Sequence, residues 1–363
     1  MAKGTKIEWA DDTQNAEMGC DGCELWDPKK GVRICYAGVL TEMRVSKGRR
    51  KGWPPAFDNP TIFPGRIAEA ARWRDLTGTT RRKPRFKPWL DGMPRVIFVN
   101  DMGDGFTASL PDDWLAPELP VMAASPHLWL FLTKRPDRQR AFSLRHELPS
   151  NVWAGTSITS PQDQRLRHLM RTRASVRWVS YEPMLGPVDW RPYLADGLNW
   201  LVVGGASGPT YQNQMMDLAW LADTVEQCRA AGVPIFVKQD SARHAGVRGR
   251  IPDELWIREY PRGIPGLIPV SPDPSVVVSR RRREIDVEIV KGTRESREIE
   301  VEIVKGSLRG IEEDEDAETD PEATPRHPGG DHPALPAGRD RCGQDSRMTS
   351  SRKRRRRRRT WSG

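Results

Sequence analysis

The feature that most constrains the fold is a unit that recurs between residues 94 and 240. Each unit has a short apolar strand, then a polar or glycine-rich turn, then a helical stretch. Strands that are apolar on both faces and alternate with helices predict an α/β fold built on a parallel sheet. Six strands are expected, at residues 95–100, 127–132, 152–155, 176–179, 200–203 and 233–237.

The clearest helix is expected at residues 217–231, and Gly232 follows it as a C-terminal cap. Four of its residues recur at intervals of three and four and therefore share one face. They are Leu218, Leu221, Val225 and Cys228. We expect Cys228 to be a core residue, because a lone thiol on an apolar helix face behaves as a small hydrophobic side chain.

With a further strand expected at residues 6–9, these units predict a full or partial parallel β/α barrel. The alternative is a doubly wound open sheet. Both architectures form their sites at the carboxyl ends of the strands. The polar residues that follow the strands therefore become candidate site residues, Asp104, Glu182 and Lys238 among them.

The composition changes near residue 270, which predicts a folded domain at 1–270 and a largely disordered, low-complexity charged tail at 271–363. The tail contains a repeat with a period of 14, REIDVEIVKG at 283–292 and REIEVEIVKG at 297–306. An acidic run at 312–316 and eight consecutive basic residues at 352–359 follow. Such like-charge blocks repel themselves and favour disorder.

The net charge of +9 belongs mostly to the first 270 residues, because the tail carries 21 basic and 19 acidic residues. This mild basic bias permits an anionic partner without requiring one. No run of 18 apolar residues is present, and the first twenty residues lack an apolar signal segment. We therefore expect a cytoplasmic protein that does not bind a membrane.

Three of the five cysteines, Cys20, Cys23 and Cys35, lie within 16 residues in the pattern C-x2-C-x11-C. Three thiolates can hold a four-iron, four-sulfur cluster and leave one iron open, although such clusters usually take four cysteines. Structural zinc is the alternative, and it requires a fourth ligand. The nearest histidine is His127, so zinc would need a distant ligand or a nearby carboxylate. A loop of reduced thiols without a metal is the third possibility.

A set of motifs resembles the phage-type three-cysteine family named after phage gene products 37 and 68, over about residues 5 to 262. The motifs include TKIEW at 5–9, GCDGCELW at 19–26, CYAG at 35–38, FVNDMGD at 98–104, YEPMLGPVD at 181–189, VVGGASGP at 202–209, AAGVPIFVKQ at 230–239 and LWIREYP at 255–261. That family is similar to radical S-adenosylmethionine enzymes. The resemblance implies a partial β/α barrel, a 4Fe-4S cluster and reductive cleavage of S-adenosylmethionine to act on an unknown substrate.

The resemblance makes Cys20, Cys23 and Cys35 the cluster ligands. Lys238 and Glu182 are the candidates for substrate contact or proton transfer. The segment Gly204, Gly205, Ser207 and Gly208 would cradle a carboxylate or phosphate of the cofactor with its backbone N–H groups, and Asp104 would bind the ribose or the amino group. An electron-donor protein is an expected partner of this chemistry.

The second hypothesis is a nucleic-acid-binding phage accessory protein with a structural metal site. Two basic stretches, at residues 44–51 and 81–87, have Trp53, Phe86 and Trp89 as their aromatic neighbours. Basic residues interleaved with aromatic ones suit single-stranded nucleic acid. In this hypothesis the three cysteines hold zinc.

Overall fold

The computed structural model describes residues 4–49, 51–82, 86–160 and 163–262. All of them belong to the first of two compact units, Met1–Arg280. The boundary expected at residue 270, the repeats, the acidic and basic runs and the expected disorder of the tail lie outside the described residues. Those expectations stay predictions.

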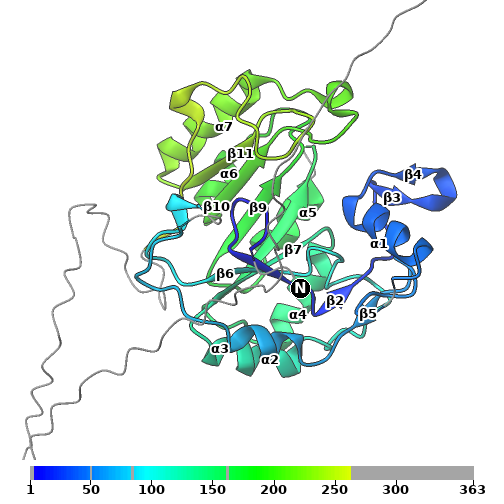
Figure 1. Cartoon of the computed structure of the whole chain (residues 1–363). Helices are drawn as coiled ribbons and strands as arrows, with labels where there is room; N and C mark the ends of the chain where they lie inside the picture. The colour runs from blue at the N-terminus through cyan, green and yellow to red at the C-terminus, as the bar shows by residue number, and fades with distance from the viewer. Residues whose placement is uncertain (1–3, 50, 83–85, 161–162, 263–363) are drawn as a thin grey trace, which may run out of the picture. The chain divides into compact units, whose positions relative to one another are not determined.

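The fold is α/β, with seven parallel strands that form a curled half-barrel (Figure 1). The sheet order is β1, β6, β7, β8, β9, β10, β11. Their bounds are β1 Asp12–Gln14, β6 Val96–Val99, β7 Leu128–Thr133, β8 Val152–Ile158, β9 Arg177–Tyr181, β10 Trp200–Gly204 and β11 Ile235–Gln239. Spatial order follows chain order without the reversal that defines a doubly wound sheet, so the partial-barrel prediction is confirmed and the doubly wound alternative is wrong.

All six strands predicted between residues 94 and 240 are present, but the N-terminal strand is displaced. It was expected at 6–9 and lies at Asp12–Gln14, where it pairs in parallel with β6. Strand β1 is fully buried although its sequence is DTQ. Its polar side chains have partners far along the chain, since Asp12 pairs with Arg95 and Gln14 donates to the Arg66 carbonyl at 2.7 Å. The prediction from hydropathy therefore places this strand too close to the N-terminus, because the strand itself is polar.

Helices cover the convex face of the sheet, and smaller elements extend beyond it (Figure 1). Helix α7 confirms the predicted helix, because the Asp217 side chain caps its first turn and Gly232 ends it with φ of 65°. The helices are α1 Tyr36–Ser46, α2 Arg66–Ala71, α3 Leu119–Ala124, α4 Pro136–Arg145, α5 Asp163–Met170, α6 Arg191–Ala195 and α7 Leu218–Ala231. The short strands are β2 Glu17–Met18, β3 Trp26–Asp27, β4 Val32–Arg33 and β5 Thr61–Ile62. Within the described residues, no helix is long and apolar enough to cross a membrane.

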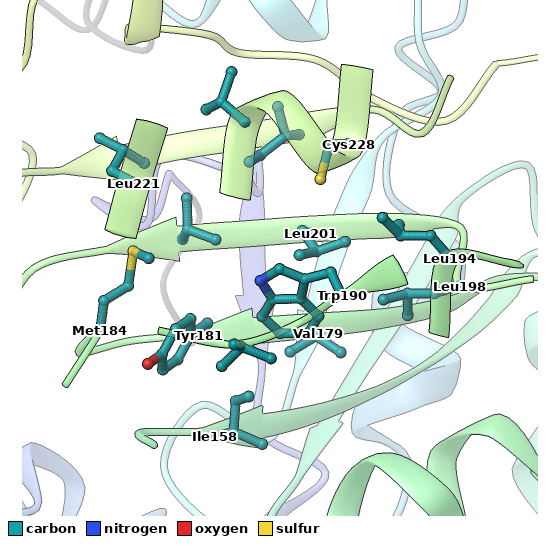
Figure 2. Close-up of a cluster of buried hydrophobic side chains, with 14 of the residues drawn as sticks. Ile158, Val179, Tyr181, Met184, Trp190, Leu194, Leu198, Leu201, Leu221 and Cys228 are labelled. Atoms are coloured by element: carbon teal, nitrogen blue, oxygen red, sulfur yellow. The ribbon is translucent and has the colours of Figure 1, made fainter. Parts of the chain in front are cut away.

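The convex face of strands β8 to β11 packs against α5, α6 and α7 in one apolar cluster (Figure 2). Trp190 and Tyr181 lie at its centre, with ring centroids 5.8 Å apart. Cys228 points into the cluster from α7 and is fully buried, as predicted. Burial raises the pKa of its thiol to about 12. Cys228 is therefore a neutral packing residue.

The concave face of the sheet is filled by aromatic side chains. Trp153, Trp178 and Trp200 come from successive strands and are fully buried. The Trp178 ring lies across Gly155, where a β-carbon would stand 2.4 Å from it. Among the described residues, these side chains pack into one apolar cluster on that face, and the polar residues at the strand ends are therefore the candidate site.

Candidate functional site at the carboxyl ends of the strands

Lys238 and Glu182 form an ion pair at the carboxyl ends of two strands. Lys238 belongs to β11 and Glu182 directly follows β9. The Lys238 Nζ lies 2.8 Å from Glu182 Oε1, and the Ser180 hydroxyl donates to Glu182 Oε2 at 3.0 Å. Only 18% and 14% of the two side chains are exposed. Two residues predicted separately therefore form one sheltered acid–base pair.

A second ion pair, Glu8 with Arg258, lies next to the first. Arg258 Nη2 is 3.1 Å from Glu8 Oε2 and donates to the carbonyl of Lys238 at 3.1 Å. The guanidinium also stacks on Trp89, Phe236 and Trp256, at 4.4, 4.9 and 4.2 Å from their centroids. Burial raises the pKa of Glu8, although Arg258 and Lys238 oppose that shift. This pair fixes the backbone of β11 beneath Lys238.

Glu8 and Arg258 were not singled out from the sequence. Both lie in motifs that carry the family resemblance, TKIEW and LWIREYP. Those motifs could have drawn attention to each residue separately. The two residues are 250 positions apart in the chain, however, and no sequence pattern indicates that they form an ion pair.

Asp104 connects the strand ends to the cysteine loop, defined here as residues 19–35. Its carboxylate accepts hydrogen bonds from Thr133 Oγ1 at 2.6 Å and from the Lys134 backbone at 3.0 Å. It also accepts one from Arg135 Nη1 at 3.2 Å. Arg135 in turn lies 3.5 Å from Cys20 Sγ and donates to the Gly22 carbonyl at 2.6 Å. The Asp104 carboxylate therefore accepts hydrogen bonds from groups of the protein itself and positions Arg135. The contact with a cofactor that was expected for Asp104 stays a prediction.

Glu24 forms a second connection between the cysteine loop and the sheet. Its carboxylate lies 2.8 Å from Lys134 Nζ and 2.9 Å from Arg165 Nη2. Burial alone would raise the pKa of Glu24, but hydrogen bonds and charges from Arg165 and Lys134 lower it to about 2. Ionic contacts therefore hold the loop against the end of β7 and against α5.

The thiols of the loop lie among hydrogen-bond donors and cations. Leu25 N–H donates to Cys23 Sγ at 3.4 Å, and Cys35 immediately precedes α1 as its N-cap residue. Burial raises the pKa of Cys20 to about 11, and burial also raises the pKa of Cys35. Both thiols are protonated at neutral pH, and a bound metal would have to displace those protons.

The donor chemistry fits thiolate ligation, because cysteine thiolates hold iron–sulfur clusters and N–H donors reach the sulfurs of Cys23 and Cys20. No disulfide joins the cysteines of the described region. Among the described residues, no three His, Cys, Asp or Glu side chains are arranged to hold a metal ion. The loop therefore supplies the ligand types, and a cluster at these cysteines is a proposal.

The glycine-rich segment after β10 is packed against the end of β11. The N–H groups of Gly205 and Gly208 donate to the carbonyls of Gln239 and Ala242, at 3.0 and 3.2 Å. A β-carbon on Gly205 would stand 2.3 Å from the Ser241 nitrogen. Close packing is therefore one reason for glycine here, and cofactor binding by Gly204, Gly205, Ser207 and Gly208 stays a prediction.

Sequence reasoning missed Glu17, which lies in β2 just before the cysteine loop. Its side chain is fully buried and neither carboxylate oxygen has a hydrogen-bond partner in the described residues. Burial and the charges of Asp104 and Asp21 raise its pKa to about 9. Glu17 is a neutral carboxylic acid at pH 7. An acidic residue in a short polar strand gives no sequence signal of such burial.

Two residues of the second basic stretch, Arg81 and Lys87, have structural roles. Arg81 is buried and donates to both oxygens of Asp11, at 3.1 and 3.0 Å. Lys87 is also buried and donates to the carbonyls of Thr5 and Ile7, at 3.0 and 2.7 Å. Their charges are directed into the protein, so they offer little to a nucleic acid.

A family model described as a protein of unknown function, DUF5131, matches residues 4–294. The chain belongs to this family. The match includes every described strand and helix, the cysteine loop and both ion pairs. No curated protein and no solved structure matches the chain. Membership in DUF5131 carries no activity with it, so the function must be argued from the site.

Proposed function

We propose that the chain is an iron–sulfur protein of the radical S-adenosylmethionine type, in which Cys20, Cys23 and Cys35 hold a 4Fe-4S cluster. One observation carries the proposal. The loop with three thiols lies at the same edge of the sheet as the Lys238–Glu182 pair. It is attached there through contacts of Asp104, Arg135 and Glu24. An electron source and an acid–base pair at one barrel mouth suit cofactor-dependent hydrogen abstraction.

The cluster, when bound, would supply the single electron that cleaves a carbon–sulfur bond of S-adenosylmethionine. The chain's own residues orient and shield the reactants. Arg135 places a positive charge 3.5 Å from Cys20 Sγ, which favours the thiolate form of that ligand. Lys238 Nζ holds a proton beside Glu182 Oε1, where a substrate can exchange it. The aromatic floor beneath them keeps water out.

Anaerobic reconstitution with iron and sulfide tests the cluster. We expect brown protein with about four irons per chain. Replacement of Cys20, Cys23 or Cys35 by Ala should remove the colour. Cys228→Ala is the matched control, because that thiol is buried in the core on α7, and it should keep the colour. Stoichiometric zinc without sulfide would contradict the proposal.

The reaction needs a separate measurement, because a cluster alone does not establish it. Dithionite-reduced protein with a full cluster should bind S-adenosylmethionine and release 5′-deoxyadenosine. Calorimetric titration measures the first and chromatography the second. If the fully loaded protein does neither, the radical-enzyme part of the proposal is wrong even if the iron analysis succeeds.

A further inference from the structure

Exposed apolar side chains gather on one helix. Eight large hydrophobic residues are exposed in the described part of the chain, and four of them fall within residues 34–43. We call Ile34, Tyr36, Val39 and Met43 the α1 stripe; they are 58%, 57%, 47% and 45% exposed. Spacings of three and four place the last three on one face of α1. Exposed apolar residues that cluster in this way are typical of an interaction surface.

The opposite face of α1 is packed against the cysteine loop, so the stripe faces away from it. Ala37, Gly38 and Thr41 are the buried residues of the helix. Gly38 lies so close to the Trp26 ring that a β-carbon would stand 2.4 Å from it. This close packing fixes the rotation of the helix and directs the α1 stripe outward.

The stripe starts at the cysteine loop. Cys35 is the N-cap residue of α1, and the Tyr36 hydroxyl donates to the carbonyl of Asp101, just beyond the carboxyl end of β6. Met43, at the far end of the stripe, lies about 12 Å from Cys35 along the helix axis, at 1.5 Å per residue. Figure 1 shows α1 with β3 and β4 beside the sheet, away from α6 and α7. A partner that covers the stripe therefore lies next to the cysteines.

The rim of the stripe is basic. Residues 27–49 contain six Lys and Arg residues and two acidic residues, which leaves a net charge of +4. Both acids are already paired, Asp27 with Lys30 and Glu42 with Arg33. The other four basic residues form no ion pair with the described part of the chain, and they are Lys29, Arg44, Lys47 and Arg49. The uncompensated charge around the stripe is therefore positive.

This charge pattern selects among possible partners. A second copy of the chain would bring one basic rim against another, and like charges at an interface disfavour that contact. A nucleic acid would meet the rim, but three of the four stripe residues are aliphatic and offer its bases no ring to stack on. An acidic protein with an apolar contact patch complements both the stripe and its rim.

The proposed reaction requires another protein at this place. Each reductive cleavage consumes one electron, which has to be delivered to the cysteine loop from another molecule. Electrons tunnel efficiently only over short distances, so the molecule that delivers them must dock close to the cysteines. Electron-transfer complexes use small, transient interfaces, and a patch of four side chains on one helix suits such an encounter.

We propose that the α1 stripe is the docking surface for an acidic one-electron carrier protein. The inference rests on the proposed function for the role of this partner. The stripe supplies the apolar contact, and the basic rim steers the acidic carrier towards it. In the transfer the carrier is oxidised by one electron and the cluster is reduced by one electron, and no covalent bond forms or breaks.

Binding to the metal-free, full-length chain tests the surface without the cluster. The probes are flavodoxin and a plant-type ferredoxin, two small acidic electron carriers, and calorimetric titration measures the Kd. We expect the wild type to bind at least one of them. Val39→Asp puts a negative charge into the stripe and should weaken binding at least about tenfold. The matched control is Leu144→Asp on α4, because the two native side chains are 47% and 46% exposed, and it should change the Kd less than about twofold.

The rim needs its own variant. Lys47→Glu should weaken binding about two- to fivefold, and raised salt should shrink that difference. Arg171→Glu is the control, because it changes the net charge equally at an exposed position after α5. Met43→Asp is a second variant of the stripe and should behave like Val39→Asp. Unchanged melting temperatures would show that all of these variants fold.

Electron delivery is measured on the chain with a full cluster. With the reduced carrier as the electron source, Val39→Asp should slow 5′-deoxyadenosine formation, and Leu144→Asp should not. With dithionite, a small reductant that needs no docking surface, Val39→Asp and wild type should react equally. A Val39→Asp defect of the same size with both reductants would overturn the docking role.

Two kinds of failure are distinguishable. A chain that forms 5′-deoxyadenosine with dithionite but binds neither carrier, or binds one equally well in every variant, would overturn the docking surface alone. A chain that binds a carrier through the stripe but takes up no iron would overturn the proposed function, and with it the carrier's role. Self-association or binding of a single-stranded oligonucleotide that Val39→Asp abolishes would assign the stripe to that partner and overturn the proposal.

Discussion

A substitution at Glu24 measures how strongly its ion pairs hold the cysteine loop against the sheet. Its pKa of about 2, in place of the ordinary 4.5, corresponds to about 3 kcal/mol at 1.4 kcal/mol per pH unit. A third of the side chain is exposed, so solvent screening reduces this to about 1–2 kcal/mol. Glu24→Gln keeps the shape and removes the charge, which leaves Lys134 and Arg165 without their shared carboxylate.

The assay is alkylation of Cys20, which is only 7% exposed and reacts when the loop opens. A loss of about 1–2 kcal/mol raises the labelling rate about 5–30-fold. The matched control is Glu42→Gln, which breaks an exposed pair with Arg33 and should change the rate less than threefold. Mass spectrometry separates Cys20 from Cys23.

The sign of the pH dependence follows from a lowered pKa. The stabilisation by Glu24 is fully present above pH 4.5 and is lost as pH falls through about 2. The ratio of variant to wild-type labelling should therefore be constant from pH 5 to 8. If Glu24→Gln opens the loop no more than Glu42→Gln does, the ionic attachment inferred from the structure is wrong.

Three further predictions concern the site. In urea unfolding at pH 8, Glu17→Gln should be more stable than wild type. The difference in free energy of unfolding should shrink toward pH 4.5, because a Glu17 pKa raised to about 9 makes wild-type stability fall as pH rises. Gly205→Val should lower the melting temperature by several degrees through collision with the Ser241 backbone, whereas Ser207→Val should spare stability and test cofactor binding by calorimetry. Lys238→Ala should retain S-adenosylmethionine binding and lose 5′-deoxyadenosine formation, measured by chromatography.

The sheet was predictable because its strands are buried on both faces and appear as continuous apolar runs. Helix α7 was predictable for a similar reason, since its pattern and its glycine cap are local. Strand β1 was misplaced because its burial depends on Arg95 and Arg66, more than 50 residues away. Its polar side chains meet these partners only in the folded chain.

The burial of charged residues also depends on partners that are distant in the sequence, so it could not be predicted from composition. Composition predicted a basic surface at 81–87, yet Arg81 is buried because Asp11 lies opposite it, 70 positions earlier in the chain. Position in the strand pattern was the better guide, because it correctly placed Lys238 and Glu182 at strand ends. It could not show that they form a pair, since that depends on the curl that brings β9 and β11 together around β10.

The two parts of the site are mechanically linked, and this affects how mutations must be interpreted. Arg135 contacts both Cys20 and Asp104, and Asp104 is bonded to the end of β7. A change at Asp104 would release the loop and lower the iron content even if Asp104 never contacts metal or cofactor. Iron analysis alone therefore cannot separate a ligand from a positioning residue. Cys20 alkylation in metal-free protein can, because loss of a ligand leaves the loop closed, whereas loss of a positioning residue opens it.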